Sequence, residues 1–190
     1  MIEELILKNR SIRRFRPDEL ISTETLRWLV GLARLSPSGA NLQPLKYILS
    51  NDKINNEKIF ECLSWAGYLN NWNGPSETER PTAYIIILND NDLSKDPGCD
   101  HGIAAQSMML GAAEKGIAGC MIGSIDRNKL RGSLMISNQY DIRLVLAIGK
   151  ANEKVVIERV KEDGNIKYYR DENNIHHVPK RKLSELILDL

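Results

Sequence analysis

Residues 100–115 limit most strictly what this chain can fold into. The segment is small or apolar on every side of a helix, and it contains Gly102, Ala104, Ala105, Met108, Met109, Leu110, Gly111, Ala112 and Ala113. A helix that is apolar all round must be buried all round. It can be the central helix of a core within one chain, or it can form the seam between two copies related by a two-fold axis. Asp100 is expected to cap this helix, and Gly116 is expected to end it.

The remaining predicted elements interleave without a regular β-α-β rhythm. Residues 83–88 are β-rich and apolar on both faces, which predicts a buried central strand, and residues 143–148 predict a second one. Shorter strands are predicted at 46–51 and 119–122, and further helices at 3–9, between Ser22 and Pro37, at 55–65 and after Asp126. The pattern predicts an α+β or mixed α/β class.

The character of the chain changes after Gly149. Apolar stretches at 155–160 and 166–169 flank Asp163-Gly164, which is a hairpin signal. Residues 173–182 are predicted to be polar and irregular, and Leu183, Leu186 and Ile187 are predicted to form a last amphipathic turn. Residues 150–190 therefore look like an arm rather than a continuation of the same core.

Composition excludes several classes of protein. A chain of 190 residues is expected to form one domain with a real hydrophobic core. Lys plus Arg is 26 against 25 for Asp plus Glu, a net charge of +1, which argues against a dedicated nucleic-acid binder. The three widely spaced cysteines predict no disulfide framework. Because no apolar run suits a bilayer and the N-terminus lacks secretory features, we expect a cytoplasmic protein.

Four arginines and a serine lie within residues 9–16, in the run Asn9-Arg10-Ser11-Ile12-Arg13-Arg14-Phe15-Arg16. Arginine forks match the oxygens of phosphate and carboxylate groups, and the serine hydroxyl adds a neutral donor. The segment therefore predicts an anion-binding site, with a solvated basic loop as the alternative.

A second candidate segment reads Ser36-Pro37-Ser38-Gly39-Ala40-Asn41-Leu42-Gln43-Pro44. Its prolines stiffen the loop, and Gly39 allows the backbone to approach a ligand closely. Asn41 and Gln43 each carry a donor and an acceptor, which suits the edge of a heterocycle. An ordinary helix-to-strand turn is the alternative.

Two further segments give weaker signals. Glycines at 116, 119 and 123 leave backbone N–H groups exposed around a short strand, without a dinucleotide-binding fingerprint. The run Val178-Pro179-Lys180-Arg181-Lys182 brings three cations to a phosphate site or to a solvated tail. Neither the adjacent histidines His176 and His177 nor Cys99-Asp100-His101 has the spacing of a zinc site, so no metal is predicted.

In combination and in this order, the segments resemble the nitroreductase family of flavin enzymes. The run Arg10-Ser11-Ile12-Arg13-Arg14-Phe15 resembles the family's first flavin-phosphate segment, and residues 37–44 resemble its second signature. The helix from Asp100 and the strand up to Gly123 are similar to its central helix and the strand behind the flavin. Val178-Pro179-Lys180-Arg181 is similar to its C-terminal phosphate clamp.

The resemblance implies an α+β, three-layer fold with a central mixed β-sheet flanked by helices. It also implies an intertwined homodimer with one FMN per subunit at the interface. Residues 1–190 would form a single FMN-binding domain, with 150–190 as an arm on the partner subunit. The implied cofactor-binding residues are Asn9, Arg10, Ser11, Arg13, Ser38, Gly39, Asn41, Gln43, Met121, Ile122, Gly123, Lys180 and Arg181.

These residues have different implied roles. Arg10, Ser11 and Arg181 would hold the phosphate and ribityl chain, whereas Asn9 stands where the family often has arginine, which removes one phosphate cation. Ser38, Asn41 and Gln43 would line the isoalloxazine, and Met121, Ile122 and Gly123 would pack behind it. Arg13 is the catalytic candidate, because a cation at the N1/O2 edge stabilises the reduced, anionic flavin.

The implied activity passes a hydride from NADH or NADPH, by way of FMN, to a nitroaromatic, a quinone or another electron-poor acceptor. One site used twice predicts ping-pong kinetics. The alternatives are a specialised relative, such as a reductive deiodinase or a flavin-fragmenting enzyme, and a non-enzymatic flavin-binding protein. Residues 65–81 are expected to shape the substrate side, and no nucleic-acid or membrane partner is expected.

Overall fold

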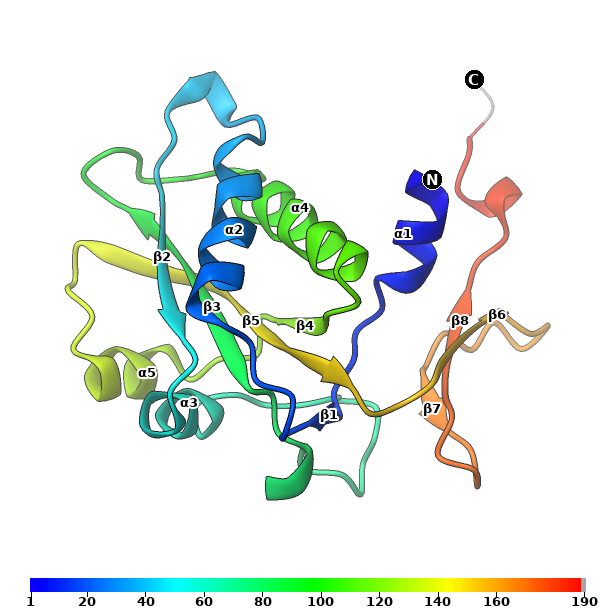
Figure 1. The fold of residues 1–190 in the computed structure, drawn as a ribbon. Coiled ribbons are helices and arrows are strands. Elements are labelled where there is room, and N and C mark those ends of the chain that lie inside the picture. The colour runs from blue at the N-terminus through cyan, green and yellow to red at the C-terminus, as the bar shows by residue number, and fades with distance from the viewer. Residues whose placement is uncertain (189–190) are drawn as a thin grey trace.

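The computed structural model describes residues 1–188 (Figure 1). Its helices are α1 (Ile2–Lys8), α2 (Thr23–Arg34), α3 (Lys53–Phe60), α4 (Asp100–Glu114) and α5 (Arg127–Leu134). Its strands are β1 (Phe15–Arg16), β2 (Leu45–Ser50), β3 (Ala83–Asp90), β4 (Ala118–Ile122), β5 (Tyr140–Ala151), β6 (Val155–Arg159), β7 (Tyr169–Arg170) and β8 (His176–Lys180). No helix within this part of the chain has the length and apolar content needed to cross a bilayer.

The main sheet is built around β5. On one side β5 pairs with β3, which pairs in turn with β2, and β4 and the short β1 also pair with β5. Within residues 1–188 the ladders of this sheet are antiparallel. The parallel component of the predicted mixed sheet is an isolated bridge between Ser11 and Gly119.

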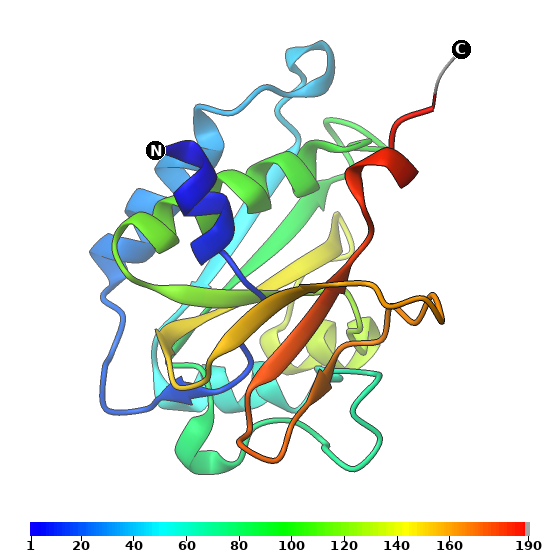
Figure 2. The ribbon, with the colours of Figure 1, turned by 90° about the vertical axis from the view of Figure 1, so that its right-hand side faces the viewer.

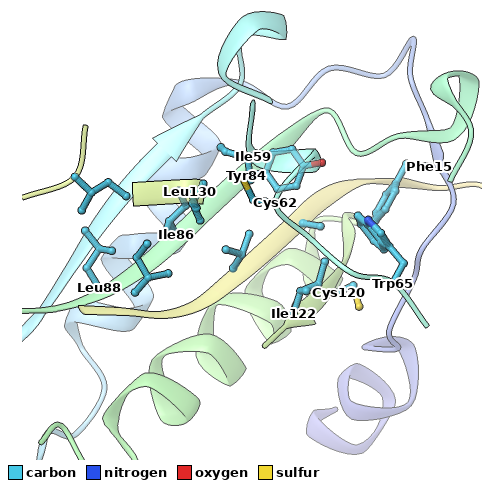
Figure 3. Close-up of a cluster of buried hydrophobic side chains, with 14 of the residues drawn as sticks. Phe15, Ile59, Cys62, Trp65, Tyr84, Ile86, Leu88, Cys120, Ile122 and Leu130 are labelled. Carbon is cyan, nitrogen blue, oxygen red and sulfur yellow. The ribbon is translucent and has the colours of Figure 1, made fainter. Parts of the chain in front are cut away.

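Alternate side chains of β3 face opposite sides of the main sheet, and helices cover both sides, so the fold has three layers. Every residue of β3 is buried. Ala83, Ile85 and Ile87 join a cluster with α2 and α4, whereas Tyr84, Ile86 and Leu88 join a second cluster with Ile59 of α3 and Leu130 of α5. Figure 3 shows this second cluster, which extends to Phe15 and Trp65. The predicted three-layer α+β fold, with helices on both faces of the central sheet, is confirmed (Figure 1).

Helix α4 confirms the predicted span and is mainly a core helix of one chain. Ala104, Ala105, Met108 and Ala112 are buried against α2 and the sheet. A Cβ at Gly111 would lie 2.2 Å from Leu32 Cδ1, so glycine permits the close contact with α2. Because Ala105 is fully buried within the chain, that face is not a free seam. Ile103 stays 39% exposed on another side of the helix.

The cap of α4 differs from the prediction. Ser22 and Asp126 accept backbone hydrogen bonds as N-caps of α2 and α5, as expected. At α4, however, Cys99 occupies the N-cap position and Asp100 is the first helical residue. The carboxylate of Asp100 accepts hydrogen bonds from Ser38 and Gly39 instead, and this contact matters for the site. Gly116 ends the helix with φ +63°, as predicted.

Two predictions for the C-terminal arm are wrong (Figure 2). The turn at Gly164 forms, but the strands on either side of it do not pair with each other. β6 pairs in parallel with β8, and β7 pairs antiparallel with β8. Residues 176–180, predicted to be irregular, are thus the central strand of a small sheet. The local turn signal was real, but the longer-range pairing of β6 with β8 determines the sheet.

Candidate functional site

The arginine-rich segment lies directly beside β4. The N–H of Ile12 donates to the carbonyl of Gly119 at 2.9 Å, and Ile12 and Phe15 anchor the segment in the core. A Cβ at Gly119 would lie 2.5 Å from the carbonyl oxygen of Ala147, so this strand position requires glycine. Close packing explains one of the glycines that the sequence analysis singled out.

A cavity of about 330 Å³ opens beside this segment. We call it the basic cavity, and its lining consists of Asn9, Arg10, Ser11, Arg13, Gln106, Met109, Gly119, Met121, Tyr168, His176, Val178 and Lys180. No ion pair within residues 1–188 involves Arg10, Arg13 or Lys180. The cavity therefore presents positive charge without a carboxylate partner, which suits an anionic ligand.

Arg13 is held by neutral groups and by a buried carboxylate behind its backbone. Its Nη1 lies 3.3 Å from the carbonyl oxygen of Ser11 and 3.4 Å from Nε2 of His176. Its guanidinium carbon lies 4.9 Å from the centre of the Tyr168 ring. The backbone N–H of Arg13 donates to Glu153, whose side chain is 1% exposed and pairs with Arg170 at 2.9 Å.

A smaller cavity of about 190 Å³ adjoins the first. This adjacent cavity is lined by Arg13, Ser64, Trp65, Ala66, Gly67, Cys120, Met121, Ile122, Gly123, Ser124 and Tyr168. Arg13, Met121 and Tyr168 border both cavities. The basic cavity supplies cations, and the adjacent cavity supplies the backbone of β4, glycines and Trp65. This combination suits an elongated ligand that carries an anionic group at one end and a flat ring at the other.

The loop 38–43 lies apart from both cavities and shares no lining residue with them. Ser38 Oγ donates to Asp100 at 2.6 Å, and the Gly39 N–H donates to the same carboxylate at 2.9 Å. Ser38 Oγ also accepts from the N–H of Gln43 at 2.9 Å. The hydroxyl of Ser38 is thus already used within the chain.

The backbone of this loop is unusual. Ala40, Asn41 and Gln43 have φ values of +47°, +55° and +51°. Left-handed backbone at a residue other than glycine costs about 1–3 kcal/mol at each position, and such positions cluster at ligand-binding sites. The side chains of Asn41 and Gln43 are exposed. The predicted heterocycle-binding amides are therefore displayed on the surface by a strained loop.

Lys180 and Arg181 occupy different places. Lys180 lines the basic cavity, whereas Arg181 lies 3.7 Å from Glu185 and its side chain is 50% exposed. The structure brings Asn9, Arg10, Ser11, Arg13, Met121, Ile122, Gly123 and Lys180 together around the two cavities. Within one chain it leaves Ser38, Gly39, Asn41, Gln43 and Arg181 outside them.

Sequence reasoning missed Tyr168, His176 and Glu153 as parts of the site. The sequence does hold one signal, in the doublets Tyr168-Tyr169 and His176-His177. Because neighbouring side chains in an extended segment point to opposite sides, one member of each doublet can face a site while the other faces away from it. Burial, assisted by the charge of Arg13, lowers the pKa of His176 to about 4, so this imidazole is neutral at pH 7. Burial raises the pKa of the Cys120 thiol, which lies in the hydrophobic core.

The residues around the two cavities fit FMN. Arg10 and Lys180 have no ion-pair partner within the described chain, and Nε of Arg10 is buried without a hydrogen-bond partner. The phosphate of FMN would supply the missing acceptor oxygens. The adjacent cavity, with Trp65, Met121 and Gly123, offers a bed for a flat ring.

The chain is similar in sequence to known proteins. Residues 6–150 match the model of the nitroreductase family. A protein of Archaeoglobus fulgidus, named as a candidate NADH dehydrogenase/NAD(P)H nitroreductase, is 28% identical over 154 residues, which cover 77% of this chain and 83% of that protein. The family match ends at residue 150, so the arm that carries Tyr168, His176 and Lys180 lies beyond it.

Solved structures share the fold. A nitroreductase family protein from Streptococcus pneumoniae superposes with a TM-score of 0.71 at 19% identity, covering 86% of this chain and 97% of that one. A candidate nitroreductase from Exiguobacterium sibiricum, solved in complex with FMN, gives a TM-score of 0.68 at 18% identity, covering 80% and 89%.

Proposed function

Because the chain belongs to the nitroreductase family, we propose that it is an FMN-dependent oxidoreductase that uses NADH or NADPH to reduce nitroaromatics, quinones or similar electron-poor acceptors. The observation that carries this proposal is the pair of adjoining cavities, with cations that have no carboxylate partner within residues 1–188 at one end and the β4 strand at the other. Residues 1–190 act as one domain in this proposal.

When bound, FMN would supply the hydride chemistry, while the protein supplies binding, orientation and electrostatics. Arg10, Ser11 and Lys180 would hold the phosphate and the ribityl chain through charged and neutral hydrogen bonds. Met121 and Gly123 would support the ring. Arg13 borders both cavities, and its guanidinium would stabilise negative charge at the pyrimidine edge.

A second copy of the chain completes the site in this proposal. The loop 38–43 carries the strained, exposed amides but does not reach the cavities of its own chain. Large apolar side chains also stay exposed on α1, on α4 and near the C-terminus: Ile2, Ile6, Leu7, Ile103, Leu183, Leu186, Ile187 and Leu188. A two-fold dimer would cover such surfaces and place one chain's loop at the other chain's cavities. In this dimer, the part of the arm that follows Lys180 would pack on the partner subunit.

The direct test combines a spectrum with turnover. Purified protein, or apoprotein titrated with FMN, is expected to show flavin absorption, and it is expected to consume NADH or NADPH rapidly when a quinone is present. Initial rates with both substrates varied should give the parallel lines of ping-pong kinetics. Protein that takes up no FMN would contradict the proposal, and protein that holds FMN without turnover would be a flavin-binding protein only.

A further inference from the structure

Tyr168 and His176, both from the C-terminal arm, enclose the Arg13 guanidinium from two sides. The Tyr168 ring lies under the guanidinium carbon at 4.9 Å, and Nε2 of His176 lies 3.4 Å from Nη1. The two rings are 5.2 Å apart, so they form one wall of the basic cavity. Tyr68 also packs against Tyr168, at 4.9 Å between ring centres, and restrains that ring.

The protonation of His176 follows from its partner. A guanidinium has hydrogen-bond donors only, so Nε2 of His176 must accept, and the single proton of the neutral ring lies on Nδ1. His176 is 1% exposed, and its low pKa keeps it neutral at pH 7. The imidazole therefore orients the arginine without adding or cancelling charge.

The partners that orient the Arg13 guanidinium are neutral, so they do not cancel its positive charge. A carboxylate beside Arg13 would orient the guanidinium but would also cancel most of its field in the cavity. An aromatic face, an imidazole nitrogen and the carbonyl of Ser11 orient it and leave the full positive charge available to a ligand. The buried carboxylate of Glu153 lies nearby, but it is engaged with the backbone of Arg13 and with Arg170.

We propose that Tyr168 and His176 are positioning residues that hold Arg13 in the basic cavity at full charge, so that the arm of the same chain tunes the reduction potential of the bound flavin. This inference rests on the proposed FMN-dependent function. It assigns the arm a role within its own chain, whereas the sequence analysis expected the arm to act on the partner subunit.

The main test uses the doublet Tyr168-Tyr169 as its own control. Tyr169 stacks on His177 at 4.7 Å, and neither residue lines the basic cavity. Tyr168→Leu should lower the midpoint potential of bound FMN, because the ratio of affinities for reduced and oxidised flavin falls about three- to tenfold. Tyr168→Phe keeps the aromatic face and should restore the potential, and Tyr169→Leu should leave it unchanged. Equal potentials for Tyr168→Leu and Tyr169→Leu would overturn the proposal.

His176 provides a second pair of variants. His176→Leu removes the acceptor and should shift the potential in the same direction as Tyr168→Leu, whereas His176→Gln keeps an acceptor oxygen and should shift it less. If Tyr168→Leu does not fold, these two variants decide the question. A potential that is the same in both histidine variants and in the wild type would contradict the positioning role.

An independent readout needs no flavin. In an NMR spectrum, the Nε–H resonance of Arg13 can be assigned by its loss in Arg13→Lys. The ring current of Tyr168 should displace this resonance from the position of a free arginine, and the line should be sharp because the guanidinium is held in one place. In Tyr168→Leu it should move to the position of a free arginine. If the wild-type protein binds no FMN but this resonance is displaced, the proposed function fails while the positioning of Arg13 stands. A resonance at the free position in the wild type would overturn the positioning itself.

Discussion

The basic cavity and the loop 38–43 were both predicted to bind the same cofactor, yet one chain assembles only the first. The basic cavity draws its lining from the segment 9–13 that follows α1, from β4 and α4, and from the arm, and Arg13 is held by contacts within the chain. The loop instead rests on the start of α4 and displays Asn41 and Gln43 to solvent. Segments that are predicted from sequence motifs to form one site can therefore lie in separate regions of a single chain.

The two regions also differ in how their conformation is maintained. Neutral contacts and the buried carboxylate of Glu153 hold the basic cavity, with no left-handed residue among its lining positions. The loop keeps left-handed backbone at Ala40, Asn41 and Gln43, and its main restraint is Asp100. The basic cavity thus forms within one chain, whereas the loop exposes its amides on the surface, where the proposed function has them meet the cavities of a second copy.

The largest expected effect comes from removing the cations of the basic cavity. Arg10→Ala combined with Lys180→Ala should weaken FMN binding by roughly 100-fold or more, because each charge-assisted contact contributes about 1.5–3 kcal/mol. The matched control is Arg10→Ala with Arg181→Ala, which removes the same net charge but keeps Lys180. Fluorescence titration with FMN measures both. If the variant that carries Arg10→Ala and Arg181→Ala bound FMN more weakly than the variant with Lys180→Ala, Arg181 rather than Lys180 would be the residue that binds the phosphate.

Mixed dimers test whether the two regions meet across chains. One chain carries Arg10→Ala and Lys180→Ala, and the other carries Asn41→Ala and Gln43→Ala. If each site combines one chain's cavity with the other chain's loop, the mixed dimer has one intact site and should bind about one FMN per dimer at wild-type affinity. Titration of dimers purified through two different tags gives the stoichiometry. Binding no better than in either parent would show that each site lies within one chain.

Asp100 tests the restraint on the loop. Asp100→Ala leaves the Ser38 hydroxyl and the Gly39 N–H without their acceptor, which should lower the free energy of unfolding by about 1–3 kcal/mol. FMN affinity should fall as well, because the loop loses its arrangement. Denaturant unfolding and FMN titration check the two effects, with exposed Asp96→Ala as the control. Lower stability with unchanged affinity would make the loop a structural turn only.

The smallest effect concerns the pH dependence of the arm that closes the basic cavity. Hydrogen bonds to Asp171 and Glu158 raise the pKa of His177 above its ordinary value of 6.5. The stabilisation is complete below that value and is lost as the pH rises through the raised pKa. The melting temperature of the wild type should therefore exceed that of His177→Gln by more at about pH 6 than at about pH 8. An equal difference at the two pH values would contradict the role of this histidine.

Local signals predicted the core of the fold well. The apolar run that became β3, the small-residue helix α4, and the caps at Ser22 and Asp126 each depend on neighbouring residues or on uniform burial. The arm was predicted wrongly, because the parallel pairing of β6 with β8 joins positions about 20 residues apart and leaves no local pattern. The turn at Gly164 is a true signal that is consistent with several pairings.

The candidate site was predictable only in part for a related reason. Motif reading found Arg10, Arg13, Met121 and Lys180, which line the cavities. It missed Tyr168 and His176, because an aromatic ring or a neutral imidazole becomes part of the site only through its contact with Arg13. The role of Asp100 was misjudged for the same reason: its sequence position suggests a cap, and only the fold shows that the loop at Ser38 competes for its carboxylate.

The basic cavity joins two segments far apart in the sequence, since residues from 9–13 and from 176–180 both contribute to its lining. During synthesis the first of these segments emerges early, and its counterpart emerges only after all the strands of the main sheet. A growing polypeptide therefore presents the arginines long before Lys180 and His176 can face them. Under the proposed function, tight cofactor capture should begin only once translation has passed the arm, so cofactor retention would distinguish chains that include the arm from fragments that end before it.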